Sequence, residues 1–169
     1  MIHHFGHKLT IFSQMRQSHL TAVKTYIEDI FKNSRFAVLA TEADGQPHAS
    51  LIAVTPLEGF RQLVFATYRN TRKYNNLVQN SKVAVLVESI DINRAGPYKS
   101  FVLTAFGHAE EIENLEKNMV FNAHLERHPE LSSFLQSEQC TFVKIKVDTY
   151  QVVRGIDDVE WWTIDDLNA

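Results

Sequence analysis

The chain has few of the residues that mark crosslinks, flexible linkers or membrane spans. It contains one cysteine, four prolines and six glycines among 169 residues, so an internal disulfide and a Gly- or Pro-rich linker are both excluded. Its uninterrupted apolar stretches, such as Phe36–Ala40, fall far short of the roughly 20 residues that a membrane-spanning helix needs. A formal net charge of −3 leaves no global field that would attract nucleic acid or anionic lipid.

These absences bear on the cellular compartment, the number of domains and the partners that we expect for the chain. Residues 1–8 lack the apolar centre of a secretion signal, and a lone cysteine, Cys140, suits a reducing compartment. With 44% hydrophobic and 22% charged residues, the composition is that of a compact globular domain. We therefore expect one cytoplasmic domain over residues 1–169, with neither nucleic acid nor membrane as a partner.

Apolar periodicity predicts a helix followed mainly by strands. Leu20, Val23, Ile27 and Ile30 recur at helical spacing and predict an amphipathic helix over residues 18–33, whereas residues 1–17 stay unassigned. The dipeptides Asp44-Gly45 and Glu58-Gly59 predict turns, the second leading into a strand that pairs back on the preceding one. We expect strands over 35–41, 47–55, 62–67, 83–87, 101–112 and 141–153, helices near 74–78 and 115–127, and further helical turns over 129–135; residues 90–97 are ambiguous.

The connections favour a small barrel over a parallel sheet. The first three strands are joined by turns too short for the crossovers that parallel strands require. Gly107 interrupts a long strand, and a glycine there is typical of a bulge or of close backbone approach. We therefore expect a mainly β fold, a six-stranded antiparallel barrel over about residues 35–153, with flanking helices and a C-terminal tail over 154–169.

A cluster of cations and hydroxyls lies where a strand ends and a helix begins. Within residues 67–73, Arg69, Arg72 and Lys73 are accompanied by Thr67 and Thr71. A helix N-terminus offers free N–H groups and a positive dipole end, so the cluster fits a phosphate dianion; cations alone would oppose that dipole. A solvated first helical turn is the alternative, and Asn70 or Thr71 is the expected N-cap.

The order of these elements resembles the FMN-binding split-barrel family typified by pyridoxamine 5'-phosphate oxidase. The resemblance rests on the Asp-Gly turn, the strand that begins Pro47-His48-Ala49-Ser50, the strand Leu63–Thr67, the segment Asn70-Thr71-Arg72-Lys73 before a helix, and Phe106-Gly107-His108-Ala109-Glu110. It covers about residues 36–112 and, more weakly, 142–153.

The resemblance implies a split barrel, an FMN cofactor and a homodimer that holds the flavin at its interface. It assigns phosphate binding to Thr71, Arg72 and Lys73, and the lining of the flavin ring and ribityl chain to Ser50, Leu51, Ile52, Ala53, Thr55 and Thr67. The activity implied is that of an FMN-dependent oxidoreductase acting on a small molecule. No catalytic side chain and no metal ligand is assigned, since the flavin itself carries the electrons.

Two departures separate the chain from the vitamin B6 oxidases of that family. Val102 stands where those enzymes have a glutamine, and the C-terminal Arg-x-His segment is missing. The sequence thus predicts a member of the family with an unassigned substrate. Storage or sensing of flavin, deazaflavin or haem by the same barrel is the non-enzymatic alternative, and a purely structural or partner-binding barrel is a third.

Several other residues carry competing interpretations. We expect His124 and His128, four apart on a helix, to be exposed rather than metal ligands. Trp161 and Trp162 are expected to fasten the tail to the barrel more than to cover a flavin. His48 and His108 face either a ligand or solvent. Arg154 either contacts a ligand or forms a surface ion pair with Asp157 or Asp158. Cys140 is expected to be a small buried residue.

Overall fold

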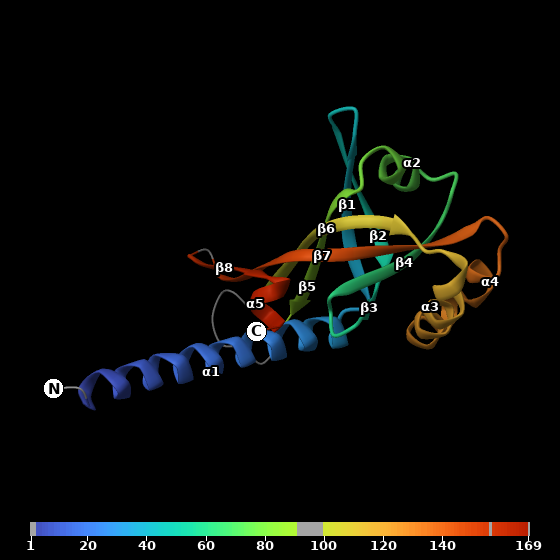
Figure 1. Ribbon diagram of the computed structural model, residues 1–169. Coiled ribbons are helices and arrows are strands. Elements are labelled where there is room, and N and C mark those ends of the chain that lie inside the picture. Colours follow the sequence, from blue (N-terminus) through green and yellow to red (C-terminus); the bar gives the residue numbers. More distant parts are fainter. Residues whose placement is uncertain (1–2, 91–99, 156, 169) are drawn as a thin grey trace.

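An eight-stranded antiparallel sheet forms the centre of the protein in a computed structural model that describes residues 3–90, 100–155 and 157–168 (Figure 1). The sheet curls into a half-barrel with helices around it, which confirms the predicted mainly β, split-barrel architecture. Its strands are β1 (Phe36–Ala43), β2 (Gln46–Ala53), β3 (Thr55–Leu57), β4 (Gln62–Tyr68), β5 (Lys82–Ile90), β6 (Ser100–Glu111), β7 (Cys140–Gly155) and β8 (Asp158–Thr163).

The hydrogen-bonded order of the strands is β2-β1-β5-β6-β7-β4-β3, with β8 also paired to β7. Strands β2 and β3 are therefore at opposite ends of this order, although only Val54 separates them in sequence. The expected pairing of the 62–67 strand back on the whole preceding strand is wrong: β4 pairs with Thr55–Leu57 alone and otherwise with β7. The chain thus switches from one end of the sheet to the other at Val54.

The predicted turns have the backbone that their sequences require. Asp44 and Gly45 have φ values of 53° and 75° between β1 and β2. The β3–β4 turn is more constrained, because Glu58, Gly59 and Phe60 all have positive φ. Phe60 is buried there, and its carbonyl accepts a hydrogen bond of 2.6 Å from the hydroxyl of Tyr150.

Gly107 lies at a β-bulge in β6, where the register against β7 shifts between Phe106 and Gly107. A Cβ at this position would lie 2.0 Å from the carbonyl oxygen of Lys146. Both features that the mid-strand glycine predicts, a bulge and a close backbone approach, are therefore present.

Helix α1 (His3–Asn33) supplies one side of the main core. It begins at His3, well before the predicted Ser18, and in Figure 1 its N-terminal turns run on past the sheet. Its C-terminal half packs against strands through the residues whose spacing predicts the helix. The buried members are Leu20, Val23, Ile27, Ile30 and Phe31.

A second, smaller core lies under the helices between β6 and β7. These are α3 (Asn114–Arg127), the 3-10 turn Pro129–Leu131 and α4 (Ser132–Leu135), close to the predicted bounds. Val64, Val120 and Phe142 are among the buried residues of this core. The short helix α2 (Arg72–Gln79) follows β4 and buries Leu77, whereas Val78, predicted on the same apolar face, is exposed.

Two differences from the predicted barrel come from short elements. The predicted strand over 47–55 is divided into β2 and β3, and the C-terminal tail forms β8 and helix α5 (Ile164–Asn168). The described residues therefore contain eight strands instead of the predicted six. Of the ambiguous residues 90–97, Ile90 ends β5, and residues 91–97 lie outside the described residues.

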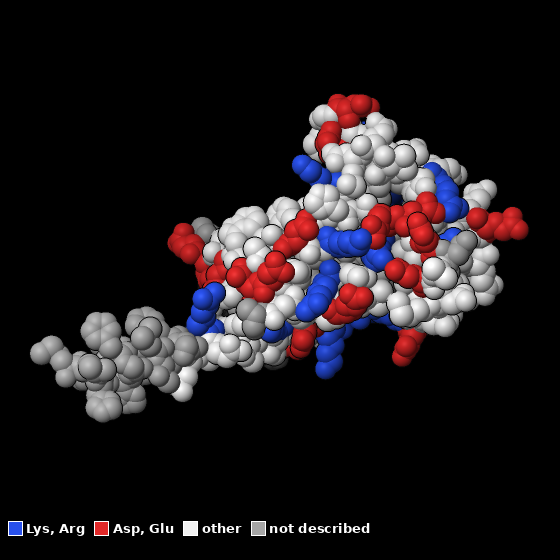
Figure 2. All heavy atoms as spheres, in the orientation of Figure 1, with Lys and Arg blue, Asp and Glu red and all other residues white. Residues whose placement is uncertain are grey.

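Charge is spread over the surface without a dominant sign. Figure 2 shows acidic and basic side chains side by side over much of the visible face, in keeping with the small net charge. Among the described residues, no helix is long and apolar enough to cross a membrane.

Candidate functional site

A pocket of about 330 Å³ lies between β2 and β4, which face each other without being hydrogen-bonded neighbours. Its volume is within the range of about 300–1,000 Å³ that is usual for small-molecule sites. Most of the lining is apolar, and the polar side chains come from the junction between β4 and α2. The lining residues are Phe36, Leu51, Ile52, Ala53, Ala66, Thr67, Tyr68, Thr71, Lys73, Leu131 and Phe134.

The N-terminus of α2 is directed at this pocket by Thr71, which confirms one of the two predicted N-caps. The Thr71 hydroxyl accepts a hydrogen bond of 3.4 Å from the Tyr74 N–H and donates one of 2.8 Å to the Tyr68 carbonyl. The first N–H groups of the helix lie outside the helical hydrogen-bond ladder, and the dipole places partial positive charge there. This end of the pocket is suited to an anion.

Arg69 is not available to that anion, because Glu111 neutralises it. The guanidinium of Arg69 pairs with the Glu111 carboxylate and also donates to the Thr141 hydroxyl at 3.3 Å. Glu111 in turn accepts 2.6 Å hydrogen bonds from the hydroxyls of Thr141 and Tyr74. Burial by itself would raise the pKa of Glu111, but the hydrogen bonds and the charge of Arg69 lower it to about 2.

Lys73 is in a different situation, since it lines the pocket and is half-buried. Within the described residues, no acidic side chain lies within 4 Å of its ammonium group. Burial lowers the pKa of Lys73, as expected of a partly desolvated cation without a counter-charge. A phosphate in the pocket would supply that counter-charge.

The structure brings six of the nine predicted cofactor residues together in the lining of this pocket: Leu51, Ile52, Ala53, Thr67, Thr71 and Lys73. The other three lie outside the lining. Arg72 is exposed at the start of α2, and the Ser50 hydroxyl is buried without a hydrogen-bond partner among the described residues. Thr55 points elsewhere, because its hydroxyl bonds to His124.

Sequence reasoning missed the aromatic part of the pocket. Tyr68 and Phe134 both line it, with ring centroids 4.6 Å apart. Tyr68 follows the predicted Thr67 directly, so the sequence indicates that it lies near the pocket. Nothing in the sequence places Phe134 and Leu131 at the pocket, because they come from the helical turns after α3, more than 60 residues after Tyr68.

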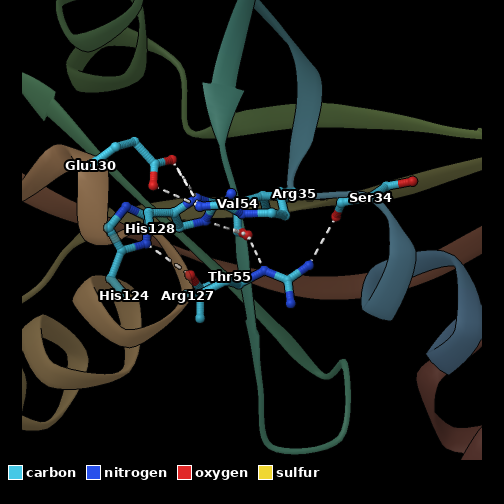
Figure 3. Close-up of polar contacts among 8 residues, drawn as sticks. All are labelled: Ser34, Arg35, Val54, Thr55, His124, Arg127, His128 and Glu130. Atoms are coloured by element: carbon cyan, nitrogen blue, oxygen red, sulfur yellow. Dashed lines mark hydrogen bonds and ion pairs between the residues drawn. The ribbon is translucent and has the colours of Figure 1, made fainter.

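The expectation that His124 and His128 are exposed is wrong. Both side chains are fully buried, and their rings lie 4.7 Å apart between centroids (Figure 3). His124 Nδ1 lies 2.8 Å from the Thr55 hydroxyl, and His128 Nε2 lies 3.1 Å from the Val54 carbonyl. Burial is tolerated because each neutral imidazole keeps one such partner. Among the described residues no group of three or more potential ligands is arranged to hold a metal ion.

The aromatic residues of the tail have separate places. Trp162 packs against the main core, which fastens β8 to the barrel as predicted, and it donates a 2.9 Å hydrogen bond to Glu160 of the same strand. Trp161 is largely exposed and stacks on Phe106 at 5.4 Å. Arg154 pairs with Asp158 at 3.3 Å and with Glu160, so its ion-pair alternative is the one observed.

The remaining single candidates lie outside the pocket lining. His108 is exposed and lies 2.8 Å from the Asp148 carboxylate, and His48 is half-buried in β2. Cys140 is partly buried at the start of β7, and burial raises the pKa of its thiol, with Arg69 acting in the opposite direction. The prediction of a small buried residue is thus met in part, since Cys140 is only partly buried.

Comparison with known families gives the decisive observation: the family model described as pyridoxamine 5'-phosphate oxidase matches residues 23–153. The chain belongs to the pyridoxamine 5'-phosphate oxidase family. The match extends from the buried half of α1 to β7 and therefore contains every residue that lines the β2–β4 pocket. A search of curated proteins finds no significant match.

Solved structures share the family fold at low sequence identity. The heme-binding protein from Mycobacterium smegmatis superposes with a TM-score of 0.72 and 20% identity, covering 82% of this chain and 56% of that chain. General Stress Protein 26 from Bacillus anthracis gives 0.61 and 24%, covering 84% and 98%. A FAD-binding protein from Mesorhizobium loti gives 0.59 and 16%, covering 73% and 88%. The present chain covers little more than half of the length of the Mycobacterium smegmatis protein.

The residues of the pocket fit a flavin mononucleotide. A flat aromatic ring system needs an apolar wall, which residues such as Leu51 and Ala66 supply, and a phosphate needs positive charge, which Lys73 and the start of α2 supply. The Thr67 and Thr71 hydroxyls, 3.0 Å apart, add polar groups to the lining where β4 leads into α2. The donor set is therefore that of an organic phosphate with an apolar body.

Proposed function

We propose that this chain binds FMN in the β2–β4 pocket and acts as an FMN-dependent oxidoreductase on a small molecule. Lys73, Thr71, Arg72 and the start of α2 bind the phosphate. The strand segment Ser50–Ala53, with Thr67, holds the ring and the ribityl chain.

The observation that carries the proposal is the half-buried Lys73, which has no acidic partner among the described residues in a mostly apolar pocket. A cation that gives up hydration without a counter-charge costs stability, and a bound dianion removes that cost. Arg69, two residues before the helix cap, shows the contrast, because Glu111 already neutralises it. The charge left for a ligand is thus concentrated at Lys73 and Arg72.

The chain's own contribution is to bind and orient the cofactor. A bound flavin supplies transfer of a hydride or of single electrons. Apolar side chains from β2, β4 and α4 exclude water from the ring, while the Thr67 and Thr71 hydroxyls fix polar contacts near the phosphate end. No side chain is assigned as an acid or base, and the substrate remains an unassigned small molecule.

We further propose a two-fold homodimer that closes the pocket. An uncharged row crosses the outer face of the sheet from β2 to β8 through paired positions. Leu51, Val38 and Leu86 in this row are 68%, 39% and 40% exposed, and Leu51 also lines the pocket. A second copy packed on this row would cover apolar surface and the open side of the site. The row consists of Leu51, Val38, Leu86, Thr104, Gln151 and Trp161.

The first experiment is an absorbance spectrum of the purified protein, followed by denaturation and chromatography of the released small molecule. We expect the spectrum to show the bands of oxidised flavin and the chromatography to recover FMN, or the protein to unfold at a higher temperature when FMN is added. Lys73→Gln should lose this binding. Lys82→Gln, a change of an exposed lysine on β5, is the matched control and should keep it. A protein that neither carries FMN nor is stabilised by it contradicts the proposal.

Non-enzymatic binding of flavin, deazaflavin or haem is the second candidate, favoured by the heme-binding structural neighbour. The pocket is less suited to haem than to flavin, because its lining contains no histidine, cysteine or methionine and offers Tyr68 as its one possible axial ligand. A haem titration decides this point: a Soret shift that Lys73→Gln leaves unchanged would favour haem elsewhere on the barrel. A tightly bound flavin that no reductant or substrate can turn over would favour storage.

A further inference from the structure

The strand switch at Val54 and Thr55 is held by three side chains from the end of α3 (Figure 3). The Val54 carbonyl accepts hydrogen bonds from Arg127 Nε at 3.0 Å and from His128 Nε2 at 3.1 Å. The Thr55 hydroxyl lies 2.8 Å from His124 Nδ1. The two histidines thus bind the single point at which the chain passes from one end of the sheet to the other.

This clamp adjoins the pocket on two sides. Ile52 and Ala53, which line the pocket, come directly before Val54. Leu131 and Phe134, which line its other side, follow His128 within two turns. The positions of both walls therefore depend on the contacts of the histidine pair.

The hydrogen bonding of the pair suits neutral imidazoles only. Each ring has one nitrogen with a partner, whereas His124 Nε2 and His128 Nδ1 are buried and have no hydrogen-bond partner among the described residues. An imidazolium carries N–H on both nitrogens, so protonation of His124 would bury a donor without an acceptor, at a cost comparable to a lost hydrogen bond or more. For His128, a Glu130 carboxylate oxygen lies 3.8 Å from Nδ1, beyond hydrogen-bond distance. Charging both rings would also place two like charges side by side.

The charged groups around the pair act mainly in the same direction. Arg127, on the same helix, and Arg35, which precedes β1, both disfavour protonation, and Glu130 opposes them with a carboxylate oxygen 3.8 Å from His128 Nδ1. Glu130 is itself bound by Arg35 at 2.7 Å. Burial is the largest effect and lowers the pKa of both histidines, to about 4 for His124.

We propose that His124 and His128 are positioning residues that hold the strand switch and both pocket walls only while both rings are neutral, so that acid opens the pocket before the barrel unfolds. The release of cofactor in this proposal rests on the proposed FMN function, but the opening does not. The main core, built from α1 and the sheet, contains neither histidine and is expected to persist.

The test compares FMN affinity between pH 7 and pH 4 in the parent, in the double variant His124→Gln/His128→Gln and in the control His108→Gln. A glutamine at 128 retains an N–H donor for the Val54 carbonyl but does not titrate. The parent and His108→Gln should lose at least tenfold more affinity from pH 6 to pH 4 than the double variant. The phosphate of FMN titrates equally in all three, so the difference belongs to the histidines.

Hydrogen exchange in the cofactor-free parent tests the opening of the pocket directly, without a variant and without a flavin. After correction for intrinsic rates, amides of residues 131–135 should lose protection on acidification while β5 and β6 remain protected. The proposal is overturned if FMN affinity depends on pH in the same way in the parent and in the double variant. It is also overturned if residues 131–135 lose protection only at the pH at which β5 and β6 lose it. If no FMN binds at any pH, the proposed function fails and the exchange result still decides whether the pair controls opening.

Discussion

The hydroxyls of Thr67 and Thr71 lie 3.0 Å apart and join the end of β4 to the first turn of α2. Either hydroxyl can be the donor in the bond between the two threonines, and the Thr71 hydroxyl also lies 2.8 Å from the Tyr68 carbonyl oxygen. Thr71 therefore connects the strand end, the helix cap and the pocket. Its hydroxyl should matter to both stability and cofactor binding.

Thr71→Ala removes the N-cap and should destabilise the protein by about 1 kcal/mol. Urea unfolding of the cofactor-free protein measures this cost, and titration with FMN should show weaker binding as well. Thr71→Ser keeps the hydroxyl and should restore both. An alanine variant as stable as the parent would mean that the cap contributes nothing.

Gly107→Ala should be among the most destabilising single substitutions in the sheet, at about 3 kcal/mol or more. The new Cβ would lie 2.0 Å from the Lys146 carbonyl oxygen, which is backbone and cannot move alone. Gly155→Ala is the control, because its nearest contact is an ordinary 4.0 Å to the Asp158 side chain. Denaturant midpoints that fall equally for the two variants would contradict the close-approach argument.

Local patterns in the sequence predict most of this fold. Asp44-Gly45 and Glu58-Gly59 require positive φ, Gly107 marks a bulge, and the spacing of Leu20 to Ile30 marks the buried face of α1. The Thr67–Lys73 cluster predicts the polar end of the pocket, since the end of the strand and the start of the helix are adjacent in the chain. Six of the nine residues that the family resemblance names line it.

Features that depend on distant segments could not be predicted in the same way. His124 and His128 look like residues of a solvated helix, and only the position of β3 shows that they bind Val54 and Thr55. Phe134 reaches the pocket from α4 without any local signal. The tail shows no strand pattern strong enough to predict β8, which depends on pairing with β7.

Glu111→Gln should lower stability at neutral pH and matter progressively less in acid. The folded-state pKa of about 2 lies below the ordinary value, so the ionised carboxylate stabilises the fold above about pH 4.5 and this contribution is lost as pH falls towards 2. Urea unfolding of parent and variant from pH 6 to pH 2.5 measures the gap. Glu113→Gln, an exposed neighbour, should show no comparable gap, and a Glu111→Gln gap that stays constant with pH would contradict the assignment.

Leu86→Asp should convert the proposed dimer to a monomer. Leu86 lies in the uncharged row beside Val38, and a carboxylate there would be buried against the partner copy. Sedimentation velocity reads the assembly, and FMN affinity should fall with it because the partner closes the pocket. Val78→Asp, an exposed position on α2, serves as control. A monomeric parent, or a dimeric Leu86→Asp protein, would contradict the proposed interface.

The proposed function depends on recognition of a flavin through its phosphate. Calorimetric titration with FMN and with riboflavin, which lacks the phosphate, tests this most directly in the parent and in Lys73→Gln. The parent should bind FMN at least tenfold more tightly than riboflavin, and Lys73→Gln should remove most of this difference, since a charge-assisted hydrogen bond contributes about 1.5–3 kcal/mol. Equal affinities for the two ligands in the parent would contradict it.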